Sequence, residues 1–401
     1  MEDPFGSFLD MDAAEEIKQA LQNSGAAAGV EKAQEYLEKQ NKIPLNIGIT
    51  GESGSGKSTF VNAFRGIDNR DERAAPTGCV ETTSEVTPYP HPNYPNVTLW
   101  DLPGIGTVKF PADKYLQHVG FERFDFFIII SADRFRENDV KLALEIQRMG
   151  KKFYFVRSKI DHNLHDAERS QRDFNAERTL EQIKENCIQG LQNQGVKAPQ
   201  VFLVSSFELQ LYDFPALQDT LEKELPAHKR HALLLAMPTI SHAIIEKKKQ
   251  ALQSKIKYYA LWSAGVAAVP LPGLSVAVDI PILIINIIRY KLTFGLDDKS
   301  LQNLALRAGV TLDDLTAVMK SPLAAKEITK ELVVNILSMS LSQGALMAGE
   351  EGSRFIPLFG IPVAMAFSFT STYRALSTFL DMVAEDAQNV LTRALGLNTS
   401  V

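Results

Sequence analysis

Cysteine is scarce in this sequence, with Cys79 and Cys187 the only two among 401 residues. Two thiols cannot build the disulfide framework of a small secreted domain, and no secretory signal opens the chain, so we expect a reduced, cytoplasmic protein. Basic residues are not in excess either, since 42 Lys and Arg against 48 Asp and Glu leave a net charge of −6. A protein with that charge balance lacks the electrostatic footprint of a nucleic-acid partner, and none is expected.

The sequence also lacks an uninterrupted apolar run long enough to cross a bilayer. The longest candidate, residues 261–288, is interrupted by Pro270, Pro272, Gly273, Asp279 and Pro281. We expect these residues to divide it into pieces too short for a hydrocarbon core about 30 Å thick, and Asp279 would cost a few kcal/mol near the centre. No transmembrane helix is therefore predicted, and a buried helical hairpin is preferred. Residues 269–277 and 356–364 are similar, which indicates either a second, partner hairpin or convergent apolar composition.

The composition is otherwise that of a soluble globular chain of two or three domains, with 45% hydrophobic and 22% charged residues. Residues 11–40 have apolar positions three and four apart, which predicts two short amphipathic helices. The domain at 43–225 alternates strand-like and helical runs, the pattern of an α/β domain with a mostly parallel sheet. Residues 1–42 and 226–401 are predicted to form an all-helical domain. The predicted strands are 45–50, 97–100, 126–131, 152–156 and 201–205.

Residues 51–58, Gly-Glu-Ser-Gly-Ser-Gly-Lys-Ser, fit the phosphate-loop pattern G-x-x-x-x-G-K-[ST] and lie between a predicted strand and a helix-like run. A glycine-rich turn at a helix N-terminus directs backbone N–H groups and the helix dipole at one point, which favours polyphosphate. Lys57 would reach the β- and γ-phosphate oxygens, and the Ser58 hydroxyl would be a ligand of Mg²⁺. The sequence therefore predicts a nucleoside triphosphate site. The nucleotide-contacting residues of this segment are Gly51, Glu52, Ser53, Gly54, Ser55, Gly56, Lys57, Ser58 and Thr59.

A second element on the phosphate side is a β-prone run that ends in Asp101-Leu-Pro-Gly104. We expect Asp101 to hold Mg²⁺ through water and the Gly104 N–H to meet the γ-phosphate, since a glycine lets that peptide reorient when the phosphate leaves. Three threonines between the two elements are candidates for the Mg²⁺ site, and their spacing does not choose among Thr77, Thr82 and Thr83. The pattern indicates a switch that senses the γ-phosphate.

The choice of base is predicted from the segment Ser158-Lys159-Ile160-Asp161, which follows a predicted strand. The Asp161 carboxylate can accept two hydrogen bonds from the N1–H and 2-amino groups of guanine, which adenine does not supply, so the nucleotide is expected to be GTP. The usual pattern has Asn or Thr before Lys-x-Asp, whereas Ser158 keeps only a hydroxyl. Ser205 and Ser206, at the end of the last predicted strand, are placed to close over the base.

The motifs occur in the order Gly-Glu-Ser-Gly-Ser-Gly-Lys-Ser, Pro-Thr77-Gly-Cys-Val-Glu81-Thr-Thr, Trp100-Asp-Leu-Pro-Gly-Ile-Gly106 and Ser-Lys-Ile-Asp161. With this set the chain resembles the immunity-related GTPases, the interferon-inducible dynamin-like group, over nearly its whole length. It is similar to the members with the ordinary Gly-Lys-Ser sequence. The resemblance implies cooperative binding of GTP, oligomerisation on intracellular membranes such as a pathogen vacuole, and hydrolysis of GTP to GDP and phosphate in the assembled state.

The same resemblance assigns Thr77 to the switch and the Mg²⁺ site, and Glu81 to assembly-dependent hydrolysis. It implies as partners GTP and GDP, a second subunit across the nucleotide face, related GTPases, and a peripherally bound intracellular membrane. Several members begin Met-Gly and are myristoylated, whereas this chain begins Met1-Glu2, so that modification is not expected. The expected metal ligands are Ser58, Thr77 and Asp101, and the expected catalytic residues are Lys57, Thr77, Glu81 and Gly104.

Ile105 stands after Gly104, where a small signalling GTPase has the glutamine that orients the attacking water. An isoleucine cannot orient water, so hydrolysis is slow or uses another group: Glu81, a backbone group or a second subunit. We favour activation by self-assembly. Two other interpretations are a GTP-gated binding module with negligible turnover, and a membrane-inserting structural protein, which the prolines and Asp279 oppose.

Overall fold

The structure is a computed structural model that describes residues 8–78, 85–104, 119–132, 137–267, 274–342 and 355–396. The chain divides into two compact units. The sheet unit is Pro44–Ile240, and the helical unit combines Met1–Ile43 with Ser241–Val401. The N-terminal and the C-terminal parts of the sequence therefore both contribute to the helical unit.

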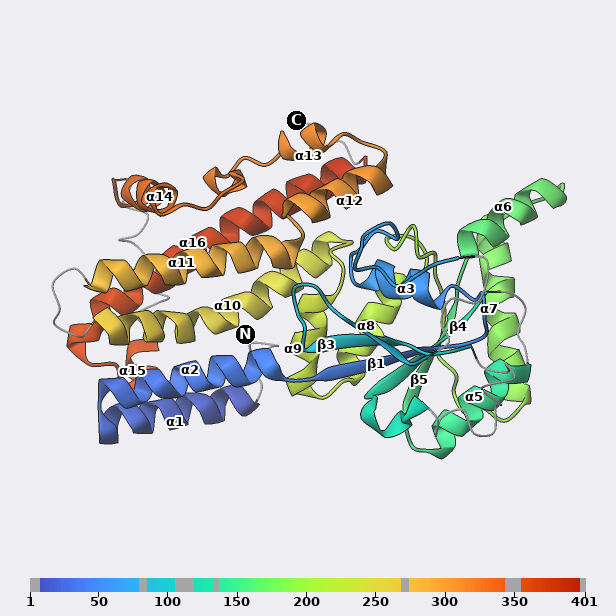
Figure 1. Ribbon diagram of the computed structural model, residues 1–401, viewed down its shortest axis with the longest axis horizontal. Coiled ribbons are helices and arrows are strands. Elements are labelled where there is room, and N and C mark those ends of the chain that lie inside the picture. The colour runs from blue at the N-terminus through green and yellow to red at the C-terminus, as the bar shows by residue number, and fades with distance from the viewer. Residues whose placement is uncertain are drawn as a thin grey trace. The chain divides into compact units, whose positions relative to one another are not determined.

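The strands of the sheet unit are β1 (Leu45–Thr50), β2 (Thr87–Pro90), β3 (Val97–Asp101), β4 (Phe126–Ser131), β5 (Lys152–Arg157) and β6 (Val201–Leu203). Within the described residues they form a six-stranded sheet in the order β2-β3-β1-β4-β5-β6 (Figure 1). Only the pairing of β2 with β3 is antiparallel among these strands. The predicted mostly parallel sheet is confirmed, and the strand that the sequence did not predict is β2. It contains Pro88 and Pro90, which lack ladder donors and are tolerated at a sheet edge, where β2 lies.

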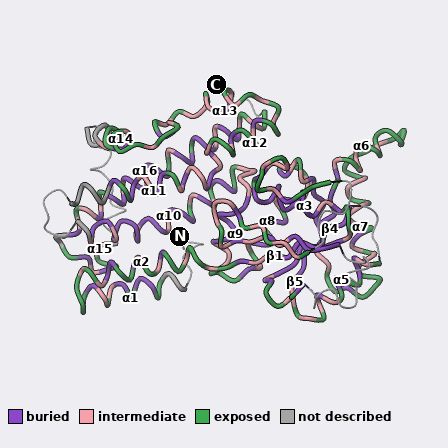
Figure 2. Tube along the Cα trace, viewed as in Figure 1, coloured by how far each residue is buried: buried purple, intermediate pink, exposed green. Residues whose placement is uncertain are grey.

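Helices cover both faces of this sheet. They are α3 (Lys57–Phe64), α5 (Glu137–Arg148), α6 (Ile160–Ser170), α7 (Ala176–Asn193), α8 (Phe214–Glu224) and α9 (Ala227–Ala236), with a 3₁₀ turn η1 (Phe121–Arg123). The alternation of β4 shows the two faces: Ile128 and Ile130 join a core with residues of α3 and α8, and Phe127 and Ile129 join one with residues of α5 and α7. Because both faces are covered, the central strands are buried along nearly their whole length (Figure 2).

Helix α9 lies in the sheet unit, beyond the boundary expected at residue 225. Its residues Leu233 and Ala236, with the following Met237, are buried in the same core as β1 and β3. Helical spacing of apolar residues shows that a helix buries one face but does not show which surface it covers. The boundary between the units therefore follows α9 and not α8.

The helical unit consists of α1 (Phe8–Ser24), α2 (Ala26–Lys42), α10 (His242–Ala267), α11 (Leu274–Phe294), α12 (Asp298–Ala308), α13 (Leu312–Thr316), η2 (Pro322–Ala324), α14 (Lys330–Ser342), α15 (Phe355–Phe359) and α16 (Val363–Ala394). Helix α10 packs against α2, α11 and α16. A Cβ built at Gly265 of α10 would lie 1.8 Å from Val30 Cγ2 of α2, so the missing side chain allows these helices to approach closely.

Helices α10 and α11 pack against each other as the hairpin expected from residues 261–288. One part of that expectation is wrong, because Pro281 lies inside α11 and does not end it. The neighbouring Ile280, Ile282 and Leu283 are buried, and tertiary packing of this kind outweighs the loss of one helical N–H donor. Within the described part of the chain, no helix combines the length and apolar character needed to cross a membrane. Of the two similar apolar segments, 356–364 forms α15 and the start of α16, whereas much of 269–277 lies outside the described residues.

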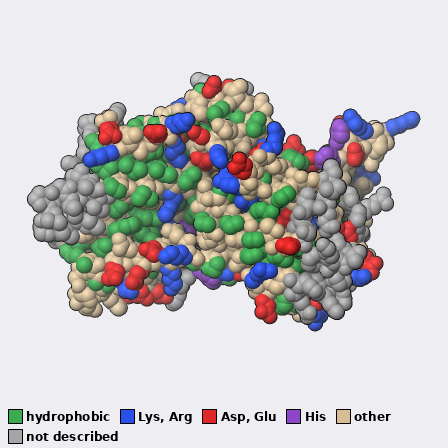
Figure 3. Space-filling view, viewed as in Figure 1, with side chains coloured by type: hydrophobic (Ala, Val, Ile, Leu, Met, Phe, Trp, Pro, Cys, Tyr) green, Lys and Arg blue, Asp and Glu red, His purple; other side chains and the backbone are tan. Residues whose placement is uncertain are grey.

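Hydrophobic side chains gather on the face of the helical unit shown in Figure 3, with acidic and basic side chains interspersed among them. On α11, Ile285 and Ile288 are 56% and 44% exposed. They stand three residues apart and so share one side of the helix. The unit therefore has an apolar surface in addition to its core.

Candidate functional site

The predicted nucleotide-binding segments follow the carboxyl ends of parallel strands in the sheet. β1 lies between β3 and β4, and it is parallel to both. Asp101, at the end of β3, pairs in register with Ile49, one residue before the end of β1. Neighbouring parallel strands have their carboxyl ends on the same side of the sheet, so Asp101 lies next to the loop that follows β1. Open α/β sheets commonly bind ligands at the carboxyl ends of their strands.

The loop between β1 and α3 has the conformation that its glycines permit. Gly51, Gly54 and Gly56 have φ angles of 138°, 77° and 92°, where residues with a Cβ are strained. A Cβ built at Gly51 would lie 2.1 Å from the carbonyl oxygen of Ile130, so only glycine fits there. Lys57 begins α3, and its Nζ donates a 2.8 Å hydrogen bond to the Glu52 carbonyl across the loop. The glycines and the Lys57 hydrogen bond therefore fix the conformation of the predicted phosphate loop.

Ser58 and Asp101 meet beside this loop. The Ser58 hydroxyl donates a 2.5 Å hydrogen bond to Asp101 Oδ2, and both side chains are buried. A hydroxyl and a carboxylate so close together are hard oxygen donors of the kind that Mg²⁺ prefers, and Mg²⁺ commonly takes its remaining ligands from water and phosphate. The two residues therefore fit the metal role expected for them.

The switch residues are only partly within the described chain. Gly104 is described, and a Cβ built there would lie 2.9 Å from the backbone nitrogen of Ser53, so glycine is required by the close approach of the phosphate loop. Thr77 is exposed, two residues after the buried Ala75. Residues 79–84 and 105–118, which include Glu81, Thr82, Thr83 and Ile105, lie outside the described residues.

The predicted base-reading segment, residues 158–161, is hydrogen-bonded to the predicted phosphate loop. Lys159 has a left-handed backbone (φ 56°), and its Nζ donates a 3.0 Å hydrogen bond to the Gly54 carbonyl. The buried Ser158 hydroxyl donates to the Ser55 carbonyl at 2.7 Å. Ser158 occupies the position at which the usual pattern has Asn or Thr, and its hydroxyl supports the phosphate loop. Asp161 is in the first turn of α6, and its Oδ1 is buried without a hydrogen bond among the described residues. An acceptor in that state suits the donors of a guanine base.

Ser205 and Ser206 follow β6. The Ser205 hydroxyl is fully buried and accepts hydrogen bonds from the backbone N–H groups of Phe207 and Glu208, both at 3.3 Å. This arrangement fixes the turn after β6, and Ser206 in that turn is half-buried. Ser205 therefore shapes the loop next to the base-reading segment.

Two sets of polar contacts were missed by sequence reasoning. In the first turn of α5, Asn138 donates to Glu52 Oε1 at 3.1 Å, and the buried Asp139 accepts from the Ser131 hydroxyl at 2.9 Å. On α3, Asn62 is buried and bonded to the backbone of Ala75. A polar residue inside the apolar run after the phosphate loop was the available signal for Asn62.

The fold and this site define the class of P-loop GTP-binding proteins. Over residues 11–394 the chain matches the family model described as Interferon-inducible GTPase (IIGP), and it belongs to that family. Interferon-inducible GTPase 5 of Bos taurus is 44% identical over 383 residues, which are 95% of this chain and 82% of the relative. Interferon-gamma-inducible GTPase 10 of Mus musculus is 40% identical over 90% of this chain and 84% of its own. Interferon-inducible GTPase 1 of Mus musculus is 39% identical over 88% of this chain and 84% of the relative. The resemblance seen in the motifs is confirmed.

Proposed function

We propose that this chain binds GTP with Mg²⁺ and hydrolyses it slowly alone and faster in a self-assembled state. The observation that carries the nucleotide assignment is the meeting of Ser58 with Asp101 beside a loop that is tied through Ser158 and Lys159 to the base-reading segment. Phosphate, metal and base contacts therefore belong to one connected site. The membership of the GTPase family supports the same assignment.

Each residue has a role that follows from its chemistry. The Lys57 amine, which donates to the Glu52 carbonyl, would exchange that acceptor for phosphate oxygens. Ser58, Thr77 and Asp101 would hold Mg²⁺, which when bound neutralises charge on the phosphates. The Gly104 N–H would donate to the γ-phosphate, and Asp161 would accept from guanine. These groups bind and orient the nucleotide.

None of these groups orients the attacking water. The side chain of Ile105, which stands where a water-orienting glutamine would serve, has no polar atom. Hydrolysis then needs a group from elsewhere, and Glu81 is the candidate when a second subunit covers the nucleotide face. Basal turnover is accordingly slow and rises with assembly, into homo-oligomers or with related GTPases.

We place this activity at intracellular membranes, vacuolar or endomembrane, in cell-autonomous innate immunity. The relatives' interferon-inducible character supports the immune role. Ile285 and Ile288, exposed on one side of α11, are the apolar side chains that would make peripheral contact with a bilayer surface.

The test measures GTP turnover per subunit over a wide range of protein concentration at saturating GTP and Mg²⁺, with light scattering on the same samples. Turnover per subunit is expected to rise together with scattering. Glu81→Ala should flatten that rise, and Glu72→Ala, a change at an exposed glutamate of the same loop region, should not. Low turnover that is independent of concentration, with tight GTP binding, would instead identify a GTP-gated binding module.

A further inference from the structure

Helix α3 carries a line of buried polar side chains in an otherwise apolar element. Ser58, Asn62 and Arg65, the C-cap of the helix, are four and three residues apart, so they lie on one face. They are only 9%, 0% and 5% exposed. The adjoining Phe60 and Phe64 enter the hydrophobic core. The polar face begins at the proposed metal ligand Ser58 and runs away from it along the helix.

Asn62 uses its amide to hold one point of the chain from two sides. Its Oδ1 accepts a 2.7 Å hydrogen bond from the Ala75 N–H, and its Nδ2 donates a 2.9 Å hydrogen bond to the Ala75 carbonyl. The second amide hydrogen is donated to Asn69 Oδ1, also at 2.9 Å. Ala75 itself is fully buried. An amide that satisfies both backbone groups of one residue fixes that residue in position and orientation.

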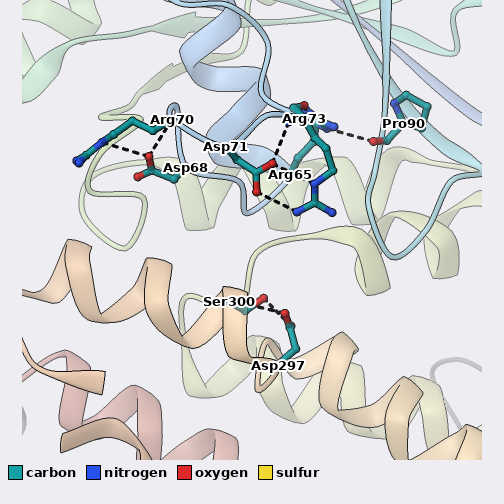
Figure 4. Close-up of polar contacts among 8 residues, drawn as sticks. All are labelled: Arg65, Asp68, Arg70, Asp71, Arg73, Pro90, Asp297 and Ser300. Carbon is teal, nitrogen blue, oxygen red and sulfur yellow. Dashed lines mark hydrogen bonds and ion pairs between the residues drawn. The ribbon is translucent and has the colours of Figure 1, made fainter. Parts of the chain in front are cut away.

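Arg65 holds two further points of the same region (Figure 4). Its guanidinium donates to the carbonyls of Arg73 at 3.0 Å and Pro90 at 3.2 Å, and it lies 5.3 Å from the centre of the Tyr89 ring. Burial, with the nearby Arg73 charge, lowers the pKa of Arg65 to about 10, so the group remains charged at neutral pH. Arg73, whose carbonyl Arg65 holds, also forms an ion pair with Asp71 in the same loop.

The anchored residue Ala75 is two positions before Thr77. Two residues of extended chain span at most about 7 Å, so fixing Ala75 limits where the Thr77 hydroxyl can lie. A buried amide would be costly without partners, and the full set of partners that Asn62 finds makes its conformation well determined. The start of α3 binds the phosphates, and its middle positions the switch threonine.

We propose that Asn62 is a positioning residue for nucleotide sensing, which sets the distance between Thr77 and the metal site through its two hydrogen bonds to Ala75. Arg65 supports the same segment from the C-cap of α3. This inference rests on the proposed role of Thr77 as a ligand of Mg²⁺. Asn62 touches neither nucleotide nor metal, and it acts through the backbone that leads to Thr77.

The test compares affinities for GTPγS and for GDP, both with Mg²⁺, by calorimetry on the full chain. Because Thr77 serves only the triphosphate state, Asn62→Ala should lower the preference for GTPγS over GDP by about tenfold, the loss expected from two hydrogen bonds. The affinity for GDP should stay within about twofold, because loop and base contacts are intact. Asn69→Ala is the matched control: it removes one bond of the same amide, spares both bonds to Ala75, and should keep the preference.

The Thr77→Ala variant tests the inference about Asn62 separately from the proposed role of Thr77 as a ligand of Mg²⁺. It should lower the preference as Asn62→Ala does, and the double variant should be no worse than Thr77→Ala alone. If Thr77→Ala lowers the preference and Asn62→Ala does not, the inference is overturned and the metal assignment stands. If Thr77→Ala has no effect, the metal assignment itself fails.

If Asn62 had a purely structural role, Asn62→Ala would lower the affinities for GTPγS and GDP by the same factor. That result would also overturn the inference. Should Asn62→Ala fail to fold, Asn62→Ser keeps a small, neutral polar group at this buried position but cannot reach both backbone groups of Ala75. It should then lower the preference by an intermediate factor of about threefold. A preference equal to that of the unaltered chain in Asn62→Ser would count against the proposal.

Discussion

Replacing Asp161 by asparagine should change which base the protein accepts. Oδ1 of Asp161 is buried without a hydrogen bond among the described residues, and Nε2 of the exposed His162 lies 3.8 Å from Oδ2. Guanine would donate two hydrogen bonds to this carboxylate, each contributing about 1.5–3 kcal/mol because the acceptor is charged. Asparagine keeps one oxygen, which is uncharged, and places an NH₂ group against a donor of the base. The loss is therefore about 2–4 kcal/mol, or about 30-fold to 1000-fold in GTP affinity.

Xanthosine triphosphate tests the direction of this effect, because its base has a carbonyl where guanine has the 2-amino group. The Asp161→Asn variant should bind it more tightly than it binds GTP. Calorimetry with both nucleotides measures the two affinities, and Asp166→Asn, an exposed carboxylate on the same helix, is the control. An Asp161→Asn protein that keeps its preference for GTP would refute the assignment of Asp161 to the base.

Two further predictions concern buried polar groups. Ser158→Ala removes the 2.7 Å bond to the Ser55 carbonyl, so it should lower the affinities for GTP and GDP by a common factor of about 5–10, whereas Ser170→Ala on the surface should leave both unchanged. Burial lowers the pKa of Lys248, whose Nζ donates to a backbone carbonyl, from 10.5 to about 7. Above pH 7 the unfolded chain therefore binds a proton that the folded chain does not, so the free energy of unfolding should rise from pH 7 up to the ordinary lysine pKa of 10.5. Denaturant titrations should show a smaller rise for Lys248→Met and an unchanged one for Lys249→Met.

The sheet was predictable where its strands are buried on both faces. The predicted ranges 45–50 and 126–131 coincide with β1 and β4, since a continuous apolar run bounded by turn residues is the sequence pattern of a covered parallel strand. The edge strand β2 has no such pattern, because it is short and contains two prolines. Pro281 was misread for the opposite reason: the packing that keeps α11 continuous comes from residues distant in sequence.

The candidate site divides in the same way. The phosphate loop, Asp101 and the Lys159–Asp161 segment are local patterns, and each was found from its own residues. The bond from Asn62 to Ala75 spans 13 residues through an irregular loop, whose path no periodicity predicts. The support that Ser158 gives to Ser55 joins segments 103 residues apart, and it depends on the order of the strands in the folded sheet.

The helical unit has a consequence for how the protein is made. Its first helices, α1 and α2, precede the whole sheet unit in the chain, whereas α15, which packs on α1, and α10, which packs on α2, follow it. Synthesis from the N-terminus therefore completes the sheet unit while the apolar faces of α1 and α2 are still without α15 and α10, and contacts such as that between Val30 and Gly265 have a very high sequence separation. Until α10 and α15 emerge, the apolar surfaces of α2 and α1 that they cover stay open to aggregation in the nascent chain.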